Sequence, residues 1–538
     1  MSSYFPAAEA DTDDRLLEDG GHVEGDARTR LDKTIDRIGM GNYQWTLLCL
    51  CGFGWMADNM WLQAVAIILP RVQAHYSVPD SQIGLLSSSM FAGMMLGAVG
   101  WGSCSDLLGR SAAFNATLFF TALFGILASF AYSFTSLCLL LFLLGSAVGG
   151  SMPTDGTLLL EHMPQHKLYL VTALSFFFSL GSVLAAIVAL FFVPSASCVS
   201  APCDPDLNNG WKHLLTALGL ITLAMFLARI VLFRLHESPR FLVHAGRQEE
   251  ALETLQLIAR FNGSPTLAGE LKLADVDDTA VLPVEDEVDT SYGYESIASD
   301  TTASNSAGGN KSKRYLAPWM ERWLSRMRMV LAPEWRRTTL LIWGAWGGMA
   351  LAYTMFNVFL PKLLESDASG DKSISDSLWD VLVFTLGGCP GALLGARLIL
   401  TPLGRRWSLA GSTLVTAAFC VLFVFAQSAG SVLATRVSAV GIGLASTTMW
   451  AVLYGWTPEI FATKVRGTAC GIASALSRIG GIIAPLVGGF LLLFSRAAPV
   501  YASMLVFVLA AGCVLCLRED EGEGGKAQRG GAGRVLVH

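Results

Sequence analysis

The feature that most constrains this chain is a series of twelve long apolar stretches. Each is long enough to cross a bilayer's hydrocarbon core as a helix, which takes ~20 residues. Their Gly, Ala and Ser content suits closely packed helices rather than the short alternating strands of a β-barrel. The stretches lie at 46–70, 83–104, 112–131, 136–158, 169–193, 213–233, 338–360, 377–398, 406–426, 431–455, 467–493 and 498–517. The sequence therefore predicts an all-α polytopic membrane protein with twelve transmembrane helices.

Composition and spacing support this fold class. The chain is 53% apolar and only 15% charged, whereas about 25% of residues are charged in an average soluble domain. Secreted, nucleic-acid-binding and disulfide-scaffold proteins are thereby excluded. The stretches form two groups of six around a long polar segment. We expect a cytosolic tail (1–45), a six-helix half (46–233), a cytosolic linker (234–337), a second six-helix half (338–517) and a cytosolic tail (518–538).

Basic residues near the span ends set the orientation. The segment between Arg28 and Arg37 and the central linker are both rich in Lys and Arg. An even number of helices between them places both regions, and both termini, in the cytosol. The membrane itself, plasma or vacuolar/vesicular, is left open. Within the linker, Leu242–Phe261 has amphipathic helical spacing, whereas 275–310 is acidic and Ser-rich and is predicted to be disordered.

Two cysteines stand apart from the rest. Cys198 and Cys203 lie in the loop between the fifth and sixth predicted helices, on the external side. An oxidising compartment permits a disulfide there, and we predict one. The remaining cysteines sit in or beside apolar spans, where small packing residues are the ordinary interpretation.

A short cytosolic turn after the second span carries a G-x-x-x-D-x-x-G-R pattern that ends at Gly109 and Arg110. Its carboxylate, Asp106, can cap a helix N-terminus, or pair with a basic partner in one conformation and release it in another. The pattern resembles the loop signature of the major facilitator superfamily. It recurs weakly between the eighth and ninth spans, where Thr401 occupies the acidic position.

Further motifs narrow the resemblance. Glu237-Ser-Pro-Arg240-Phe-Leu follows the sixth span, and Thr457-Pro-Glu459 with Arg466-Gly467 follows the tenth. Together these look like the sugar-porter, organic-ion-transporter and synaptic-vesicle-glycoprotein branch, and most like its synaptic-vesicle-related transporters. The resemblance implies alternating access between two six-helix halves. It also implies a cytosolic gate formed by Asp106, Gly109, Arg110, Glu161, Glu237, Arg240, Arg436, Glu459 and Arg466.

The chain also departs from the family pattern. The family usually has an arginine early in helix 4, but no arginine occurs between Arg110 and Arg229. Arg436 keeps the equivalent place at the start of helix 10, so the implied charge network would be complete only in the second half. The glutamine patterns that sugar porters carry in helices 5 and 7 are missing here. Hexose is therefore a less favoured substrate than other small organic solutes.

Two ionisable residues fall near mid-depth, where a charge costs ~2.5–3.5 kcal/mol on insertion scales. Asp58 lies about twelve residues, or ~18 Å, into helix 1, and Arg478 reaches a similar depth in helix 11. They form a structural ion pair or bind polar neighbours, or else Asp58 couples a proton and Arg478 attracts an anionic substrate. Asp155, beside the potential hinge at Pro153, is a third candidate whose carboxylate reaches either the cavity or only an interface.

Aromatic and amide residues on the helices that line the cavity in this fold would suit a flat or aromatic solute better than a polyol. They are Trp55, Asn59, Gln63, Trp346, Tyr353, Asn357, Trp450 and Tyr454. No metal-ligand spacing, P-loop or nucleophile–base arrangement is present, so we expect neither a metal nor a cofactor nor enzyme activity.

The sequence thus favours a secondary active transporter, proton-coupled, that moves a small organic anion. Its expected partners are the lipid bilayer, a small-molecule substrate and a proton, with no nucleic acid, and the expected state is a monomer. An efflux pump for a drug or secondary metabolite is an alternative within transport. A transporter-like receptor or vesicle component without flux is an alternative of another class.

Overall fold

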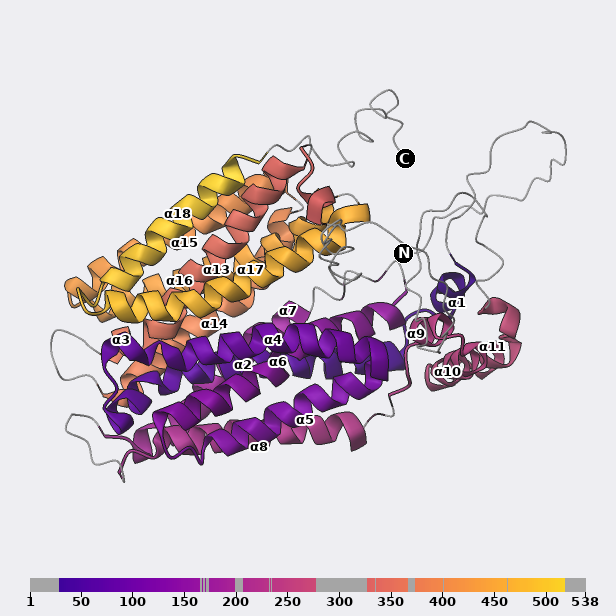
Figure 1. Cartoon of the computed structure of the whole chain (residues 1–538), viewed down its shortest axis with the longest axis horizontal. Helices are drawn as coiled ribbons and strands as arrows, with labels where there is room; N and C mark the ends of the chain where they lie inside the picture. The colour runs from indigo at the N-terminus through magenta and orange to yellow at the C-terminus, as the bar shows by residue number, and fades with distance from the viewer. Residues whose placement is uncertain are drawn as a thin grey trace, which may run out of the picture.

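The computed structural model describes residues 29–164, 167, 170, 174–198, 207–231, 233, 235–276, 327–333, 335–365, 373–399, 401–461 and 463–517. Its long helices run roughly along the longest axis of the molecule and form two bundles that lie side by side (Figure 1). The N-terminal half contains α2 (Asn42–Tyr76), α4 (Leu85–Leu108), α5 (Arg110–Ala128), α6 (Phe134–His162), α7 (Leu174–Phe192) and α8 (Gly210–Val231). The C-terminal half contains α13 (Arg336–Glu365), α14 (Ile374–Ile399), α15 (Gly404–Ser428), α16 (Val432–Ile460), α17 (Thr463–Leu491) and α18 (Ala498–Leu515).

Each predicted apolar stretch falls on one of these helices, so the all-α, twelve-helix prediction is confirmed. In the described residues, eleven helices are long and apolar enough to cross a membrane by length and composition. The remaining long helix is α2, which has 35 residues. Asp58, Asn59 and Gln63 interrupt its apolar run. Asp58 and Gln63 are buried inside the bundle, so they do not face the surrounding hydrocarbon.

The two halves repeat one packing scheme. In the N-terminal half α2 packs on α7, α4 on α6 and α5 on α8. The corresponding pairs of the C-terminal half are α13 with α17, α14 with α16 and α15 with α18. This correspondence is what an internal duplication of six-helix halves produces.

Glycines allow the closest helix pairs to approach. A Cβ at Gly97 of α4 would lie 1.9 Å from the carbonyl oxygen of Ser146, and one at Gly145 of α6 would lie 2.2 Å from that of Met90. Small residues at helix interfaces bring backbones together in this way within membranes. The α4–α6 pair therefore depends on its glycines.

Short helices form a cap on one end of the N-terminal half (Figure 1). The cap consists of α1 (Arg30–Ile38), α9 (Pro239–His244), α10 (Gln248–Phe261), α11 (Pro265–Glu270) and the 3₁₀ turn Leu273–Asp275. Arg240 pairs with Asp32 at 2.8 Å, and Arg37 pairs with Glu270 at 2.6 Å. These contacts fasten α1 to the helices that follow the sixth span. We call this the cap end of the bundle and the opposite one the far end.

The predicted single helix over Leu242–Phe261 is wrong in one respect. The chain breaks it at Gly246, whose φ of +74° only glycine adopts readily, so that α9 and α10 are separate. α10 then buries Ala251, Leu255 and Ile258, as its spacing predicts. The stretch 275–310 that we predict to be disordered lies, from residue 277 onward, outside the described residues.

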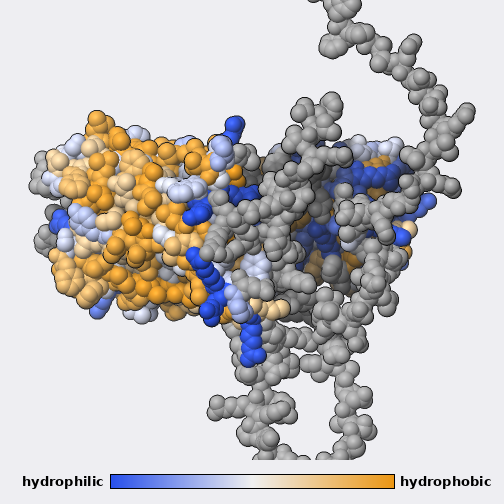
Figure 2. Space-filling view, turned by 90° about the horizontal axis from the view of Figure 1, so that it is seen from above, coloured by the Kyte–Doolittle hydropathy of each residue, from blue (hydrophilic) through white to orange (hydrophobic). Residues whose placement is uncertain are grey.

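The surface of the bundle is apolar over a broad area. Figure 2 shows hydrophobic side chains covering the visible face of the C-terminal half, with hydrophilic ones gathered toward the cap end. Exposed residues such as Phe425 of α15 and Leu509 of α18 contribute, each being 62% exposed. An exposed apolar surface of this extent suits a hydrocarbon surrounding.

Candidate functional site

A cavity of about 600 Å³ lies between the two halves. Helices α2, α4, α6 and α7 line it from the N-terminal half, and α13, α14, α16 and α17 from the C-terminal half. The volume is within the range of sites that hold small organic molecules. Its lining extends from Ser87 of α4, near one end of the bundle, to Gly471 and Ser474 of α17, toward the cap end.

At the far end, charged side chains join the two halves. Arg71 of α2 pairs with Glu365 of α13, and Lys362 of α13 pairs with Asp80, which begins the short α3 (Asp80–Ile83). We call these four residues the clasp. Lys362 also donates a 2.7 Å hydrogen bond to Gln73. The clasp joins the two halves at this end of the bundle.

The loop that follows α7 supports the clasp. The Arg71 guanidinium donates a 2.7 Å hydrogen bond to the carbonyl oxygen of Cys198, and the Asn208 amide donates one of 2.9 Å to the Arg71 carbonyl. Cys198 is disulfide-bonded. Cys203 lies outside the described residues, so its pairing with Cys198 stays a prediction.

Ion pairs near the cap end have a different arrangement. Arg110 of α5 approaches Glu161 of α6 at 3.5 Å, inside the N-terminal half. Arg405 of α15 pairs with Glu459 of α16 at 2.7 Å, inside the C-terminal half. Each of these pairs holds one half together, whereas the clasp holds the halves to each other.

Predicted gate residues also fix local backbone. The Glu237 carboxylate accepts hydrogen bonds from the Arg110 backbone N–H at 2.8 Å and from the Ser111 hydroxyl at 2.7 Å, at the start of α5. Gly109 has φ +102°, and a Cβ there would lie 2.5 Å from that carboxylate. The motif's second glycine is therefore required both by conformation and by space. The side chains of Asp106 and Arg466 lie outside the described residues.

Arg436 does not lie with the other predicted gate residues that the structure describes. Arg436 pairs with Asp380 of α14 at 2.6 Å, at the far end of the bundle. The reason is direction: α16 starts at the far end and reaches the cap end only near Glu459. Arg436 thus stabilises the C-terminal half at the opposite end from Arg110 and Glu161.

Most of the predicted cavity residues line the cavity. Those that do are Trp55, Asn59, Gln63, Tyr353, Asn357, Trp450 and Tyr454. Trp346 does not: it is 3% exposed, and its indole N–H donates a 2.9 Å hydrogen bond to Thr457. Its ring lies behind Tyr454, with ring centroids 4.9 Å apart. The sequence places Trp346 on the correct helix but cannot say which layer it occupies.

Arg478 of α17 is the one charged residue among the described lining residues. Its electrostatic neighbours are Tyr454 and Asp58. Within the described part of the chain, no hydrogen bond or ion pair occupies its guanidinium. The group is therefore available to an anionic ligand in the cavity.

Asp58 lies behind the cavity wall and is 1% exposed. Its carboxyl interacts with the nearby Ser151 hydroxyl, although no hydrogen bond of good geometry reaches either carboxyl oxygen among the described residues. Asn59 instead donates to the Phe178 carbonyl at 2.7 Å. Asp58 and Arg478 interact only at long range and form no ion pair in the described structure. Burying a carboxylate in such a surrounding is costly.

Asp155 occupies neither the cavity wall nor the surface. It forms a 2.8 Å ion pair with Arg229 of α8, and both side chains are completely buried. The Arg229 guanidinium also donates to the carbonyl oxygens of Leu50 and Phe114. Sequence reasoning missed Arg229, which ends a predicted span and matches no family motif. The pairing of a mid-helix aspartate with an arginine near a span end was the available signal.

The Asp155–Arg229 pair depends on Gly54 of α2. A Cβ at Gly54 would lie 1.8 Å from an Asp155 carboxyl oxygen and 2.6 Å from an Arg229 guanidinium nitrogen. Glycine therefore leaves the space that the ion pair fills. Asp58, four residues further along α2, lies close enough to both charges to interact with them electrostatically.

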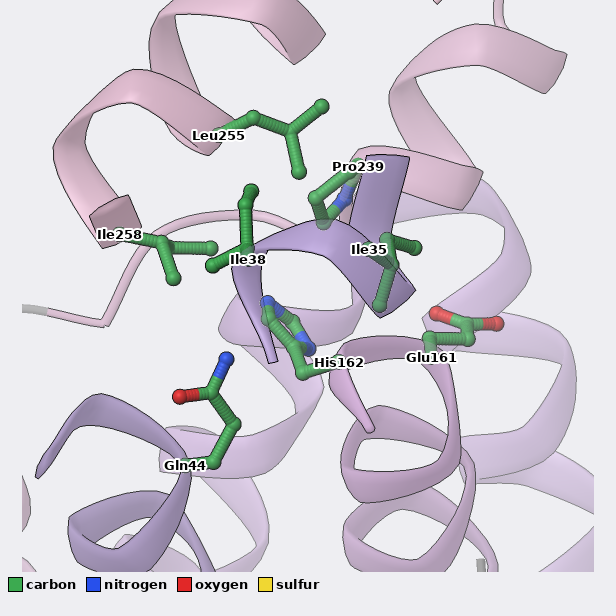
Figure 3. A pocket seen from close by; sticks show the side chains of 8 residues that line it. All are labelled: Ile35, Ile38, Gln44, Glu161, His162, Pro239, Leu255 and Ile258. Atoms are coloured by element: carbon green, nitrogen blue, oxygen red, sulfur yellow. The ribbon is translucent and has the colours of Figure 1, made fainter. Parts of the chain in front are cut away.

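A second, much smaller void lies where the cap meets the N-terminal half (Figure 3). Its volume is about 10 Å³, which is room for no more than one water molecule. Its lining residues are Ile35, Ile38, Gln44, Glu161, His162, Pro239, Leu255 and Ile258. The His162 ring bonds to the Leu158 carbonyl at 2.8 Å. This void is a small packing defect where the cap contacts the bundle.

Comparisons with known proteins agree with this architecture. The family model described as "Sugar (and other) transporter" matches residues 40–272, and that described as "Major Facilitator Superfamily" matches residues 345–538. The MFS siderochrome iron transporter 1 of Ceriporiopsis subvermispora is 33% identical over 90% of this chain and 88% of its own length. The synaptic vesicle 2-related protein of Bos taurus is 27% identical over 94% of this chain and 85% of its own length.

Among solved structures, a partially occluded, inward-open conformation of the xylose transporter XylE from E. coli matches with a TM-score of 0.65. The match covers 89% of this chain and 99% of that one at 15% identity. At that identity the likeness concerns the fold alone. In the described residues, no group of three or more His, Cys, Asp or Glu side chains is placed to hold a metal ion.

Proposed function

Because the chain belongs to the major facilitator superfamily of membrane transporters, we propose that it is a proton-coupled secondary active transporter of a small organic anion. It is a polytopic membrane protein that moves a small molecule. The names of its relatives point to different cargoes, siderochrome iron in one and xylose in another. The residues that line the cavity are the evidence for the class of cargo.

The single observation that carries the proposal is the place of Arg478. A guanidinium stays charged even in a low-dielectric site and binds a carboxylate through two parallel hydrogen bonds. In the described cavity wall no other charge competes with it or neutralises it. An anion therefore gains more from entering this cavity than a cation or a sugar does.

Proton coupling rests on Asp58. Its carboxyl is buried, interacts with the Ser151 hydroxyl and lies within electrostatic reach of Arg478, and the described residues hold it in no ion pair. An anion bound at Arg478 and a proton bound at Asp58 offset each other's charge. Joint entry of an anion and a proton is the coupling expected of a symporter.

Alternating access is supported by the difference between the two ends. The clasp joins the halves at the far end, and the cavity lining extends toward the cap end. Opening the far end requires separation of Arg71 from Glu365 and of Lys362 from Asp80. In the proposed orientation the cap end is cytosolic, and the membrane is a plasma or vesicular one.

The test uses the purified full chain in proteoliposomes with an imposed pH gradient and a panel of radiolabelled carboxylates, amines and sugars. The Asp58→Asn change keeps size and hydrogen bonding but removes titration. Concentrative uptake of the transported carboxylate should vanish in that variant, while exchange across equal concentrations survives. Unchanged accumulation by Asp58→Asn would contradict proton coupling at this residue.

Arg478→Lys and Arg478→Gln test the anion assignment separately. The lysine variant should weaken carboxylate binding because an ammonium cannot form the bidentate contact. Arg397→Gln is the matched control, since it removes an exposed arginine of the same half that does not line the cavity. If Arg478→Gln transports carboxylates with unchanged affinity, efflux of neutral or cationic compounds is the better assignment. Binding without flux in the unmodified protein would favour a receptor.

A further inference from the structure

We infer that the transported anion is a planar aromatic carboxylate, bound with its carboxylate at Arg478 and its ring on the wall of Tyr353, Trp450 and Tyr454. This inference rests on the proposed function and names the substrate class of the same cavity. It combines three observations: an aromatic surface whose rings pack on one another, a surface of methionines in the other half, and polar groups without partners.

The aromatic wall is preassembled. Trp450 and Tyr454, one turn apart on α16, have ring centroids 5.8 Å apart at an interplanar angle of 36°. Tyr353 of α13 meets Trp450 edge-on, at 6.2 Å and 80°. These separations fall in the 4.5–7 Å range in which aromatic rings attract one another. A ligand ring that enters the cavity therefore meets an ordered aromatic surface at low entropic cost.

Trp346 braces that wall from behind. Its ring meets Tyr454 at 87° and Trp450 at 68°, and its N–H is anchored on Thr457. Tyr454 is nevertheless 49% exposed, because its ring faces the cavity. The wall thus offers an open aromatic face at the level of Arg478, with which Tyr454 interacts.

The N-terminal half supplies the other side. Met90, Met94 and Met95 of α4 all line the cavity. Methionine is unbranched and polarisable, fits irregular shapes and makes favourable contacts between sulfur and aromatic rings. A flat ring held between the aromatic wall and these methionines would contact both halves at once. A polyol would gain no comparable contact from these two surfaces.

Polar atoms in the cavity wall lack partners. They are the indole N–H of Trp55, the amide nitrogen of Gln63, the amide oxygen of Asn357 and, nearer the far end, the hydroxyl of Ser87. A buried polar group without a hydrogen bond costs about 1–3 kcal/mol, so a ligand that satisfies these groups binds more tightly. The donors of Trp55 and Gln63 and the acceptor of Asn357 fit a ring that carries a hydroxyl or a ring nitrogen away from its carboxylate.

The experiment compares two acids with the same substituents, one on a flat aromatic ring and one on a saturated ring: 4-hydroxybenzoate and trans-4-hydroxycyclohexanecarboxylate, with 4-hydroxybenzamide as the uncharged reference. Binding to the purified full chain is measured by isothermal titration, and transport by counterflow in proteoliposomes. We expect the aromatic acid to bind about tenfold more tightly than its saturated counterpart. Trp450→Leu should abolish this preference, while Trp450→Phe should retain it.

Trp379→Leu is the control, because Trp379 belongs to the same half, is 51% exposed and does not line the cavity. The thermal midpoint of each ligand-free variant separates misfolding from loss of recognition. Equal binding of the two acids by the unmodified chain, or a preserved preference in a folded Trp450→Leu, overturns the aromatic assignment and leaves the anion proposal standing. Binding of the amide as tightly as the acid, or of neither acid, overturns the anion proposal and this inference with it.

Discussion

The two halves share one packing scheme but differ in where the charges near the cavity lie. In the N-terminal half, Asp58, Asp155 and Arg229 are each no more than 1% exposed and lie behind the cavity wall. In the C-terminal half, Arg478 lies on that wall beside exposed aromatic rings. A duplicated fold can thus place proton chemistry in one copy and ligand recognition in the other. Under the proposed function, Asp58 serves proton coupling and Arg478 serves ligand binding, whereas the Asp155–Arg229 pair stabilises its own half.

The largest expected effect is the loss of stability when the buried Asp155–Arg229 pair of the N-terminal half is broken. Arg229→Gln leaves the Asp155 carboxylate buried without its counter-charge, which should lower the free energy of unfolding by about 3–5 kcal/mol. Arg478→Gln should change stability by only about 0.5 kcal/mol. Thermal unfolding in detergent measures both. Asp155→Asn in the Arg229→Gln background should recover most of the loss, and equal effects of Arg229→Gln and Arg478→Gln would remove the contrast between the halves.

A smaller effect is expected when the pair is crowded rather than broken. Gly54→Ala places a methyl group against the Asp155 carboxyl and should cost about 1–3 kcal/mol of stability. Gly156→Ala is the control, since a Cβ at this helical glycine, next to Asp155 in sequence, would meet nothing within 4 Å. The two variants are compared by their thermal midpoints. If Gly54→Ala is as stable as Gly156→Ala, the ion pair does not need the space that Gly54 leaves.

In the C-terminal half, Trp346 lies behind the aromatic wall and allows a milder test. Trp346→Phe keeps the ring contacts and removes the hydrogen bond to Thr457, which is worth about 0.5–1.5 kcal/mol. We expect a several-fold higher KM with little change in kcat, because Tyr454 and Trp450 lose their brace. Uptake kinetics decide this. A change in pH dependence instead of KM would place Trp346 in the coupling machinery.

The smallest expected effect concerns the clasp that joins the halves. Glu365→Gln removes the charge that faces Arg71 and should shift the balance between open and closed far ends by about 1 kcal/mol. A cysteine introduced as Ser87→Cys, in the cavity wall near the far end, reports this shift through its rate of labelling by a membrane-impermeant thiol reagent. Lys362→Met should act more weakly, since Lys362 and Asp80 are more exposed than Arg71 and Glu365. Labelling that slows in Glu365→Gln would mean that the clasp does not keep the far end closed.

Much of the site follows from the sequence because its signals are local. An apolar run long enough to cross a bilayer has to become a helix, and a charge within such a run is rare enough to be noticed. Asp58 and Arg478 stand out in this way, and so do the aromatic residues of α13 and α16. Helix order then places them in the cavity once the family's arrangement of helices is known.

The sequence by itself therefore determined the helices, the two halves and the depth of the interior charges. The tertiary structure decided what each charge meets: Asp155 meets Arg229 rather than the cavity, Arg436 meets Asp380 at the far end, and Trp346 stands behind the wall. Helices cross at angles and depths that no single helix encodes. Partners from α6 and α8, or from α14 and α16, are therefore fixed only when the bundle packs and every buried charge must find a counter-charge or a proton.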